Sequence, residues 1–294
     1  MAGRSGASQF VLPRTAWLAV PALLFLVVFF VAPVSTMVRN SFNTQLASGI
    51  MAANFTFANY ARFFGTEIYR HVLVVTLRVG IVTTLIAIVV AYPLAWVVAR
   101  GPKFAARIVL LIVVMPLLVN IVARSFGWRI ILGRTGPFNT LLDWLGVEAG
   151  HLFLYTEPAV VVGSLHVFLP LMVLPLANAL GAIPRNLEES AAALGASPFE
   201  VFFKVILPLS LPGIGAGAIL VFTLTASSFV LPAILGGDFS KMLGTLVEEQ
   251  LLSVSNWPFG SAIATVMMLL NLFVVVGYGF LVDRRLRAWA GAAA

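Results

Sequence analysis

Long stretches without a charged residue dominate the chain and alternate with shorter polar segments. An α-helix needs roughly 20 residues to cross the hydrocarbon core of a bilayer, and six of the stretches approach or exceed that length. They are 15–38, 79–99, 108–123, 158–184, 205–237 and 250–282. The pattern predicts an all-α membrane protein with six transmembrane helices, the last of which begins near Trp257.

The composition supports this class of protein. Hydrophobic residues make up 61% of the 294 residues and charged residues only 10%, with a mean hydropathy of +1.03. A soluble domain carries roughly 45–50% apolar and 25% charged residues, and a disordered chain is poorer still in Leu, Val and Phe. Both classes are therefore excluded. The chain has no cysteine, which also excludes disulfides and thiolate chemistry.

The charge distribution predicts the orientation in the membrane. An even number of spans places both termini on one side. Lys and Arg are denser in 100–107, 185–204 and 284–287 than in the longer loops between them, which favours cytoplasmic N- and C-termini (N-in/C-in). The net charge of +7 suits contact with anionic membrane lipid, whereas no basic run interleaved with aromatic residues indicates nucleic acid.

The chain divides into three parts. Residues 1–70 contain an N-terminal tail, the first transmembrane helix and an outer loop; 71–282 form the transmembrane core; 283–294 form a basic, Ala-rich cytoplasmic tail. The first apolar run is longer than the core of a signal peptide and has no small-x-small cleavage site after it, so we expect a retained helix. Turn residues at 133–137 precede an expected short interfacial helix over 138–145.

The loop between the fourth and fifth spans predicts two short helices joined by a sharp turn. Asn186 can cap a helix, with Glu189 completing a capping box, and Gly195 supplies a left-handed stop. A second start follows at once, because Ser197 is a favoured cap residue, Pro198 suits the first helical position, and Glu200 falls three residues after the cap, as in a capping box. We expect this second helix to continue directly into the fifth span.

The first helix of this loop carries one apolar stripe. Leu187, Ala191 and Leu194 recur at helical spacing, and the small residues among them allow another surface to approach closely. From the residues alone, the stripe suits either docking to another protein or resting on lipid.

A few polar residues lie at membrane depth and are candidates for lining a translocation path. They are Thr225, Ser227, Ser228 and Asn271. Helix packing is the alternative, since hydroxyls can bond back to their own helix. We expect Ser228 to line the path, Phe229 to close it as an apolar gate, and Pro232 to kink the helix. His166, the histidine within a span, is expected to make a hydrogen bond between helices.

The motifs of the loop resemble those of a known family. Glu189-Ser190-Ala191, then Gly195, then Val205-x-Leu207-Pro208 is similar to the EAA motif of binding-protein-dependent ABC importer permeases, with Ser190 in place of the usual Ala. Further stretches resemble the polyamine-type (spermidine/putrescine-like) branch of that family. They are 124–128, 136–139, 211–213, 229–232, 236–237 and 256–260.

The resemblance implies a type I importer permease in the bacterial inner membrane, with defined partners. These are a second, homologous permease subunit, two ATP-binding cassette ATPase subunits and a periplasmic solute-binding protein. The loop 186–208 would be the element that couples the permease to the ATPase. The residues carried over for coupling are Glu188, Glu189, Ser190, Ala191, Leu194, Gly195, Ala196 and Pro198.

The same resemblance implies a transporter subunit rather than an enzyme. No phosphate-binding loop occurs in the sequence, so ATP would be bound by the partner subunits, and no cofactor or metal is expected. The resembled polyamine permeases often carry acidic residues near the positions of Ser228 and Ala233. Their absence here weakens a polycation as the solute and leaves a polyamine, an opine or related amine, or an aminophosphonate open.

Two other classes of membrane protein require residues that the sequence lacks. An ion-coupled secondary transporter usually shows charged residues within its spans and an internal repeat. An intramembrane enzyme needs a nucleophile with its base, or a set of metal ligands. The sequence displays neither pattern.

Overall fold

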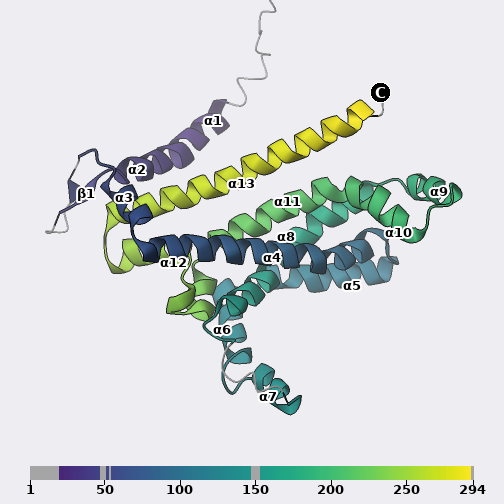
Figure 1. Cartoon of the computed structure of the whole chain (residues 1–294), viewed down its shortest axis with the longest axis horizontal. Helices are drawn as coiled ribbons and strands as arrows, with labels where there is room; N and C mark the ends of the chain where they lie inside the picture. The colour runs from purple at the N-terminus through teal and green to yellow at the C-terminus, as the bar shows by residue number, and fades with distance from the viewer. Residues whose placement is uncertain (1–19, 47–50, 53, 147–152, 293–294) are drawn as a thin grey trace, which may run out of the picture.

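The protein is a bundle of long apolar helices (Figure 1). The computed structural model describes residues 20–46, 51–52, 54–146 and 153–292, with the side chains of Phe239 and of residues beyond 280 excepted. Among these residues, five helices are long and apolar enough to cross a membrane, or six if one bent pair counts as a single span. The predicted all-α membrane fold is confirmed, and its N-in/C-in orientation stays a prediction.

The N-terminal part contains the first span and a small outer-loop structure. The span is one helical run with an exposed surface, and residues 15–19 of the predicted window lie outside the described part. The elements in order are α1 (Val20–Leu26), the π-turn η2 (Val27–Val31), α2 (Ala32–Asn40), β1 (Thr44–Gln45), β2 (Met51–Ala52) and α3 (Ala58–Gly65). The two strands pair antiparallel, Thr44 opposite Ala52.

Three helices form the centre of the bundle, and a fourth runs alongside them (Figure 1). They are α4 (Glu67–Arg100), α8 (Glu157–Ala182) and α11 (Leu207–Ala226), with α13 (Trp257–Ala292) as the fourth. The predicted span 79–99 begins later than α4 does. Charged residues limit how much of a helix enters lipid, but they do not end the helix itself. Likewise, α13 continues helically into the segment predicted as a separate tail from 283.

The predicted third span is not one straight helix. The chain forms α5 (Lys103–Val114) with the 3₁₀ turn η3 (Met115–Leu118), bends by 103°, and continues as α6 (Ile121–Ile131). Pro116 has no backbone N–H to continue the helix, and the Asn120 side chain caps α6 by accepting from the Val122 amide at 2.7 Å. The expected short helix near 138–145 is confirmed as α7 (Pro137–Trp144).

The predicted fifth span is also shorter than its charge-free window. Helix α11 ends at Ala226, and the chain then turns through short elements before α13. These elements are the π-turn η5 (Pro232–Gly236), the 3₁₀ turn η6 (Asp238–Ser240), α12 (Leu243–Glu248) and the π-turn η7 (Glu249–Ser253). Pro232 stands in the first turn of η5, so it begins a new helical turn and does not kink α11 as predicted.

Small residues let the central helices approach closely. A Cβ at Gly213 would come within 2.8 Å of the Pro175 carbonyl oxygen of α8, so only glycine permits this backbone contact. Gly215, on another side of α11, lies directly against Tyr278 of α13, whose hydroxyl donates to the Leu211 carbonyl at 3.1 Å. The two glycines therefore set the distances from α11 to α8 and to α13.

Candidate functional site

The loop after α8 forms the predicted pair of helices with a sharp turn between them. Helix α9 (Arg185–Ala193) leads into α10 (Pro198–Val201), at the end of the bundle opposite β1 (Figure 1). Gly195 has φ +88°, the left-handed conformation that glycine adopts most easily. The Ala196 amide donates to the Ala191 carbonyl at 3.1 Å and the Gly195 amide to that of Ala192 at 2.9 Å. This Schellman arrangement satisfies the last carbonyls of α9.

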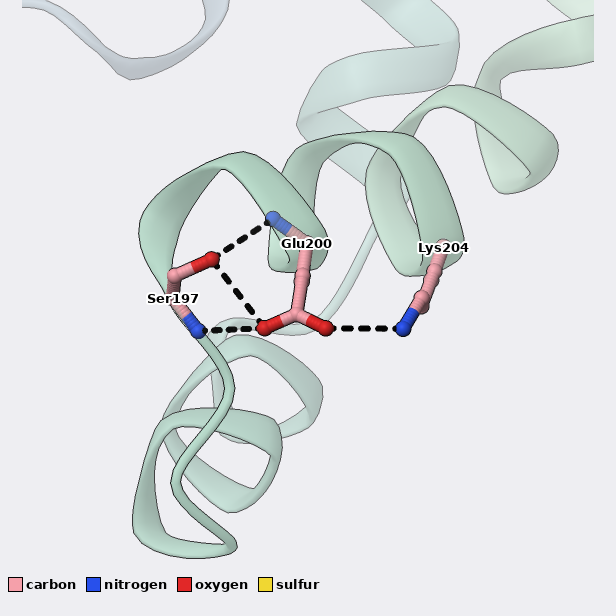
Figure 2. A network of polar contacts seen from close by, with 3 residues as sticks. All are labelled: Ser197, Glu200 and Lys204. Carbon is pink, nitrogen blue, oxygen red and sulfur yellow. Dashed lines mark hydrogen bonds and ion pairs between the residues drawn. The ribbon is translucent and has the colours of Figure 1, made fainter.

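The start of α10 is fixed by the predicted capping box (Figure 2). The Glu200 amide donates to the Ser197 hydroxyl at 3.3 Å, and the Ser197 amide donates to the Glu200 carboxylate at 3.0 Å. Lys204, one turn further on, donates to the other carboxylate oxygen at 2.8 Å. Helix α10 continues through the π-turn η4 (Phe202–Ile206) into α11, as expected. Hydrogen bonds therefore fix the turn at the end of α9 and the start of α10 alike.

The predicted cap at Asn186 was wrong. Helix α9 begins at Arg185, its N-cap position is Pro184, and no side chain caps it. The extended backbone of Pro184 (ψ 134°) leads directly into the helix, so Asn186 is already a helical residue. The acidic residue of the first turn is Glu188, which favours the positive end of the helix dipole.

The coupling candidates divide between two faces of the loop. Glu189, Ser190, Leu194, Gly195 and Pro198 are exposed, with Leu194 89% exposed, and so is Leu187 of the apolar stripe. Ala191 and Ala196 pack against the core of the bundle, and Glu188 forms an ion pair with Arg100 at the end of α4. The predicted apolar stripe therefore does not share one environment, because Ala191 faces the bundle whereas Leu194 points away from it.

Arg100 is a residue of this site that sequence reasoning missed. The sequence used it only as one of the positive charges that set the orientation. Its side chain is 9% exposed and lies where α4, α8 and α9 meet. The available signal was its place as the basic residue that closes an apolar window directly before Gly101-Pro102.

The path candidates gather around the end of α11. The Thr225 side chain is fully buried, and the Ser227 hydroxyl accepts a hydrogen bond of 3.0 Å from the Asn271 amide of α13. Ser228 is half-buried, and its carbonyl lies so close to α12 that a Cβ at Gly244 would come within 2.5 Å of it. Four of the five candidates therefore lie close together. Three of them are near neighbours in the chain, and Asn271 contacts one of these, Ser227.

Phe229, the fifth candidate, has a different environment. It is 49% exposed and follows the end of α11. There the chain makes a tight turn, in which the Ser228 amide donates to the Thr225 carbonyl at 3.1 Å. The role of Phe229 as an apolar gate stays a prediction.

His166 makes the expected contact between helices. The Trp128 indole N–H of α6 donates to its Nδ1 at 3.0 Å, and the two rings meet edge to face with centroids 5.7 Å apart. The hydrogen bond ties the bent third span to α8.

Comparison with known proteins adds family information to this geometry. A family model described as "Binding-protein-dependent transport system inner membrane component" matches residues 80–288. The spermidine/putrescine transport system permease protein PotB of Escherichia coli is 32% identical over 254 residues, which are 86% of this chain and 92% of that protein. PotB of Haemophilus influenzae is 34% identical over 271 residues, 90% of this chain and 94% of that protein.

Solved structures give the same picture at the level of the fold. A chain of a bacterial alginate ABC transporter, in complex with an alginate pentasaccharide-bound periplasmic protein, is similar with a TM-score of 0.74 and 17% identity, covering 92% of this chain and 93% of that one. A chain of the inward-facing MetNI methionine ABC transporter is similar with a TM-score of 0.52 and 24% identity, covering 76% of this chain and 98% of that one.

Proposed function

Because the chain belongs to the inner-membrane components of binding-protein-dependent transport systems and has the fold of a type I ABC importer permease, we propose that it forms half of a translocation path together with a second, homologous permease. Two ATPase subunits on the cytoplasmic side and a periplasmic solute-binding protein complete the assembly. The chain is a multi-pass inner-membrane transport subunit, and ATP is bound by its partners.

The exposed leucine at the turn between α9 and α10 carries the proposal for coupling. Leu194 is 89% exposed, yet the turn that presents it is fixed by the Schellman bonds and by the capping box of Ser197 and Glu200. A rigid loop loses little conformational entropy when it binds, so an apolar side chain held this way suits docking to a groove on another protein. We assign this groove to the ATPase.

The solute proposal rests on the PotB relatives and on the neutral groups near the end of α11. Ser227, Ser228 and Asn271 are partly exposed and offer hydroxyl and amide groups and no carboxylate, whereas Thr225 is fully buried beside them. Such a lining suits a small polar amine of modest charge, such as a short polyamine or an opine. Uptake of labelled putrescine, spermidine and an opine by the reconstituted importer tests this, and an importer that transports none of them contradicts it.

A pair of cysteine variants tests the docking proposal and the orientation together. The chain has no natural cysteine, so Leu194→Cys is the sole thiol in its variant. The matched control is Leu252→Cys, a leucine that is 72% exposed in η7, far from the loop. We expect Leu194→Cys to cross-link to the ATPase and to be labelled only from the cytoplasm, and Leu252→Cys to be labelled only from outside without that cross-link. Equal cross-linking of both, or the reversed labelling, contradicts the proposal.

A further inference from the structure

Arg100, the last residue of α4, contacts three different helical elements at once. Its Nε donates to the Leu180 carbonyl at 3.1 Å, and its guanidinium NH2 donates to the Ile183 carbonyl at 2.8 Å. Its NH1 lies 2.9 Å from the Glu188 carboxylate, an ion pair whose angles are outside those of a hydrogen bond. Arg100 therefore joins the end of α4 to the end of α8 and to the first turn of α9.

The chemistry of arginine suits this position. The last carbonyls of a helix have no partner within the helix, and a guanidinium presents several donors in one fixed plane. Here two of those donors satisfy carbonyls at the end of α8, and a third nitrogen faces a carboxylate. The guanidinium carbon also lies 5.9 Å from the centre of the Trp96 ring, within the range of a cation–π contact.

The chain itself connects α9 directly to only two of the long helices. Helix α9 is connected to α8 through Ile183 and Pro184, and to α11 through α10. The long helix α4 is far from α9 along the chain, because α5 to α8 lie between them in sequence. The ion pair of Arg100 and Glu188 therefore gives α9 a direct connection to α4.

We propose that Arg100 is a positioning residue that transmits displacement of α9 to α4 and to the end of α8. Glu188 is its partner on α9, whereas the neighbouring Glu189 is exposed and available for the ATPase. This inference rests on the proposed function, since it needs α9 to be displaced by a docked ATPase. It adds a second route beside the continuous run from α10 to α11.

Arg100→Gln, Glu188→Gln and the double variant test the inference, each made in the natural sequence for the ATPase and transport measurements and in the Leu194→Cys background for cross-linking. The matched control is Arg78→Gln, which removes an arginine from the same helix α4, where it pairs with Glu157 at the other end of α8. Four quantities are measured in proteoliposomes: cross-linking to the ATPase, basal ATPase activity, its stimulation by the binding protein, and solute taken up per ATP hydrolysed.

We expect Arg100→Gln to retain the cross-link and basal ATPase activity while the solute taken up per ATP falls about tenfold, a factor typical of losing one charge-assisted interaction. Glu188→Gln should also lower the ratio, and the double variant should lose no more than Arg100→Gln alone, because the substitution of Arg100 already removes its link to Glu188. Arg100→Lys should restore part of the ratio, since lysine keeps the charge but not the forked donors. Arg78→Gln should stay within about twofold of the parent.

A normal transport ratio in Arg100→Gln overturns the inference. So do losses that multiply in the double variant, or a cross-link that falls in step with uptake, which indicates that Arg100 only holds the loop in shape. A missing cross-link in the parent Leu194→Cys protein refutes the docking proposal instead, so the two failures are distinguishable.

Discussion

Substitution of Gly195 separates the shape of the loop from its contacts. The residue has φ +88°, and a Cβ built on it meets no atom within 4 Å in the described part of the chain beyond its own neighbours, so the Cβ itself meets no obstacle there. The only cost is that of the left-handed backbone, about 1–2 kcal/mol for an ordinary L-residue relative to glycine. Asn tolerates this region, whereas a β-branched residue such as Val is the least suited to it.

The cost predicts a graded loss of coupling across Gly195→Asn, Gly195→Ala and Gly195→Val. A strain of about 1–2 kcal/mol shifts the balance between the observed turn and relaxed loops by a factor of roughly 5–30. Stimulation of the ATPase by the binding protein, measured in the reconstituted importer at equal amounts of assembled complex, should fall in the order Asn, Ala, Val. The thermal unfolding midpoint of the permease should change little, because Gly195 is exposed and lies outside the core.

Two results refute this reasoning. Wild-type stimulation in Gly195→Val shows that the turn does not need its left-handed residue. An equal loss in Asn and Val shows that the side chain, not the backbone, is what the ATPase detects.

Three further substitutions test the packing and the path. Gly215→Ala places a Cβ on the ring of Tyr278 and should destabilise the bundle by about 1–3 kcal/mol, seen as a lower unfolding midpoint, whereas Gly277→Ala, with open space around it, should not; equal midpoints contradict the close contact. Phe229→Ala should raise ATPase activity without binding protein if the ring is a gate, and an unchanged basal rate argues against one. Ser228→Leu should slow uptake while assembly is retained; wild-type uptake removes Ser228 from the path.

The sequence predicts the helices of this fold well and their breaks poorly. Charge-free windows located every span, because lipid excludes charges strongly. The same criterion cannot detect the bend at Pro116 and Asn120, nor the end of α11 at Ala226, since both breaks lie inside apolar windows. At the α11 break a turn of small polar residues closes the helix while the hydropathy stays high.

The candidate site shows a similar division. Local chemistry predicted the turn at Gly195 and the box of Ser197 and Glu200, because both depend on residues within a few positions of one another. Arg100 and Glu188 are far apart in sequence, with α5 to α8 between them, and no local pattern indicates their contact. Hydrogen bonds between distant helices, such as Asn271 to Ser227, become visible only once the packing is known.

The unbroken helical run from Pro198 to Ala226 has a mechanical consequence. Its 29 residues extend about 44 Å, and its close contacts with α8 lie near the middle, at Gly213 and Gly217. A stiff rod held at such a point pivots like a lever, with arms of about 25 Å toward the loop and about 18 Å toward Ser227. We therefore expect a displacement of α10, carried by the run as one body, to reach the hydrogen bond between Ser227 and Asn271 with its direction reversed and its amplitude reduced by about a third.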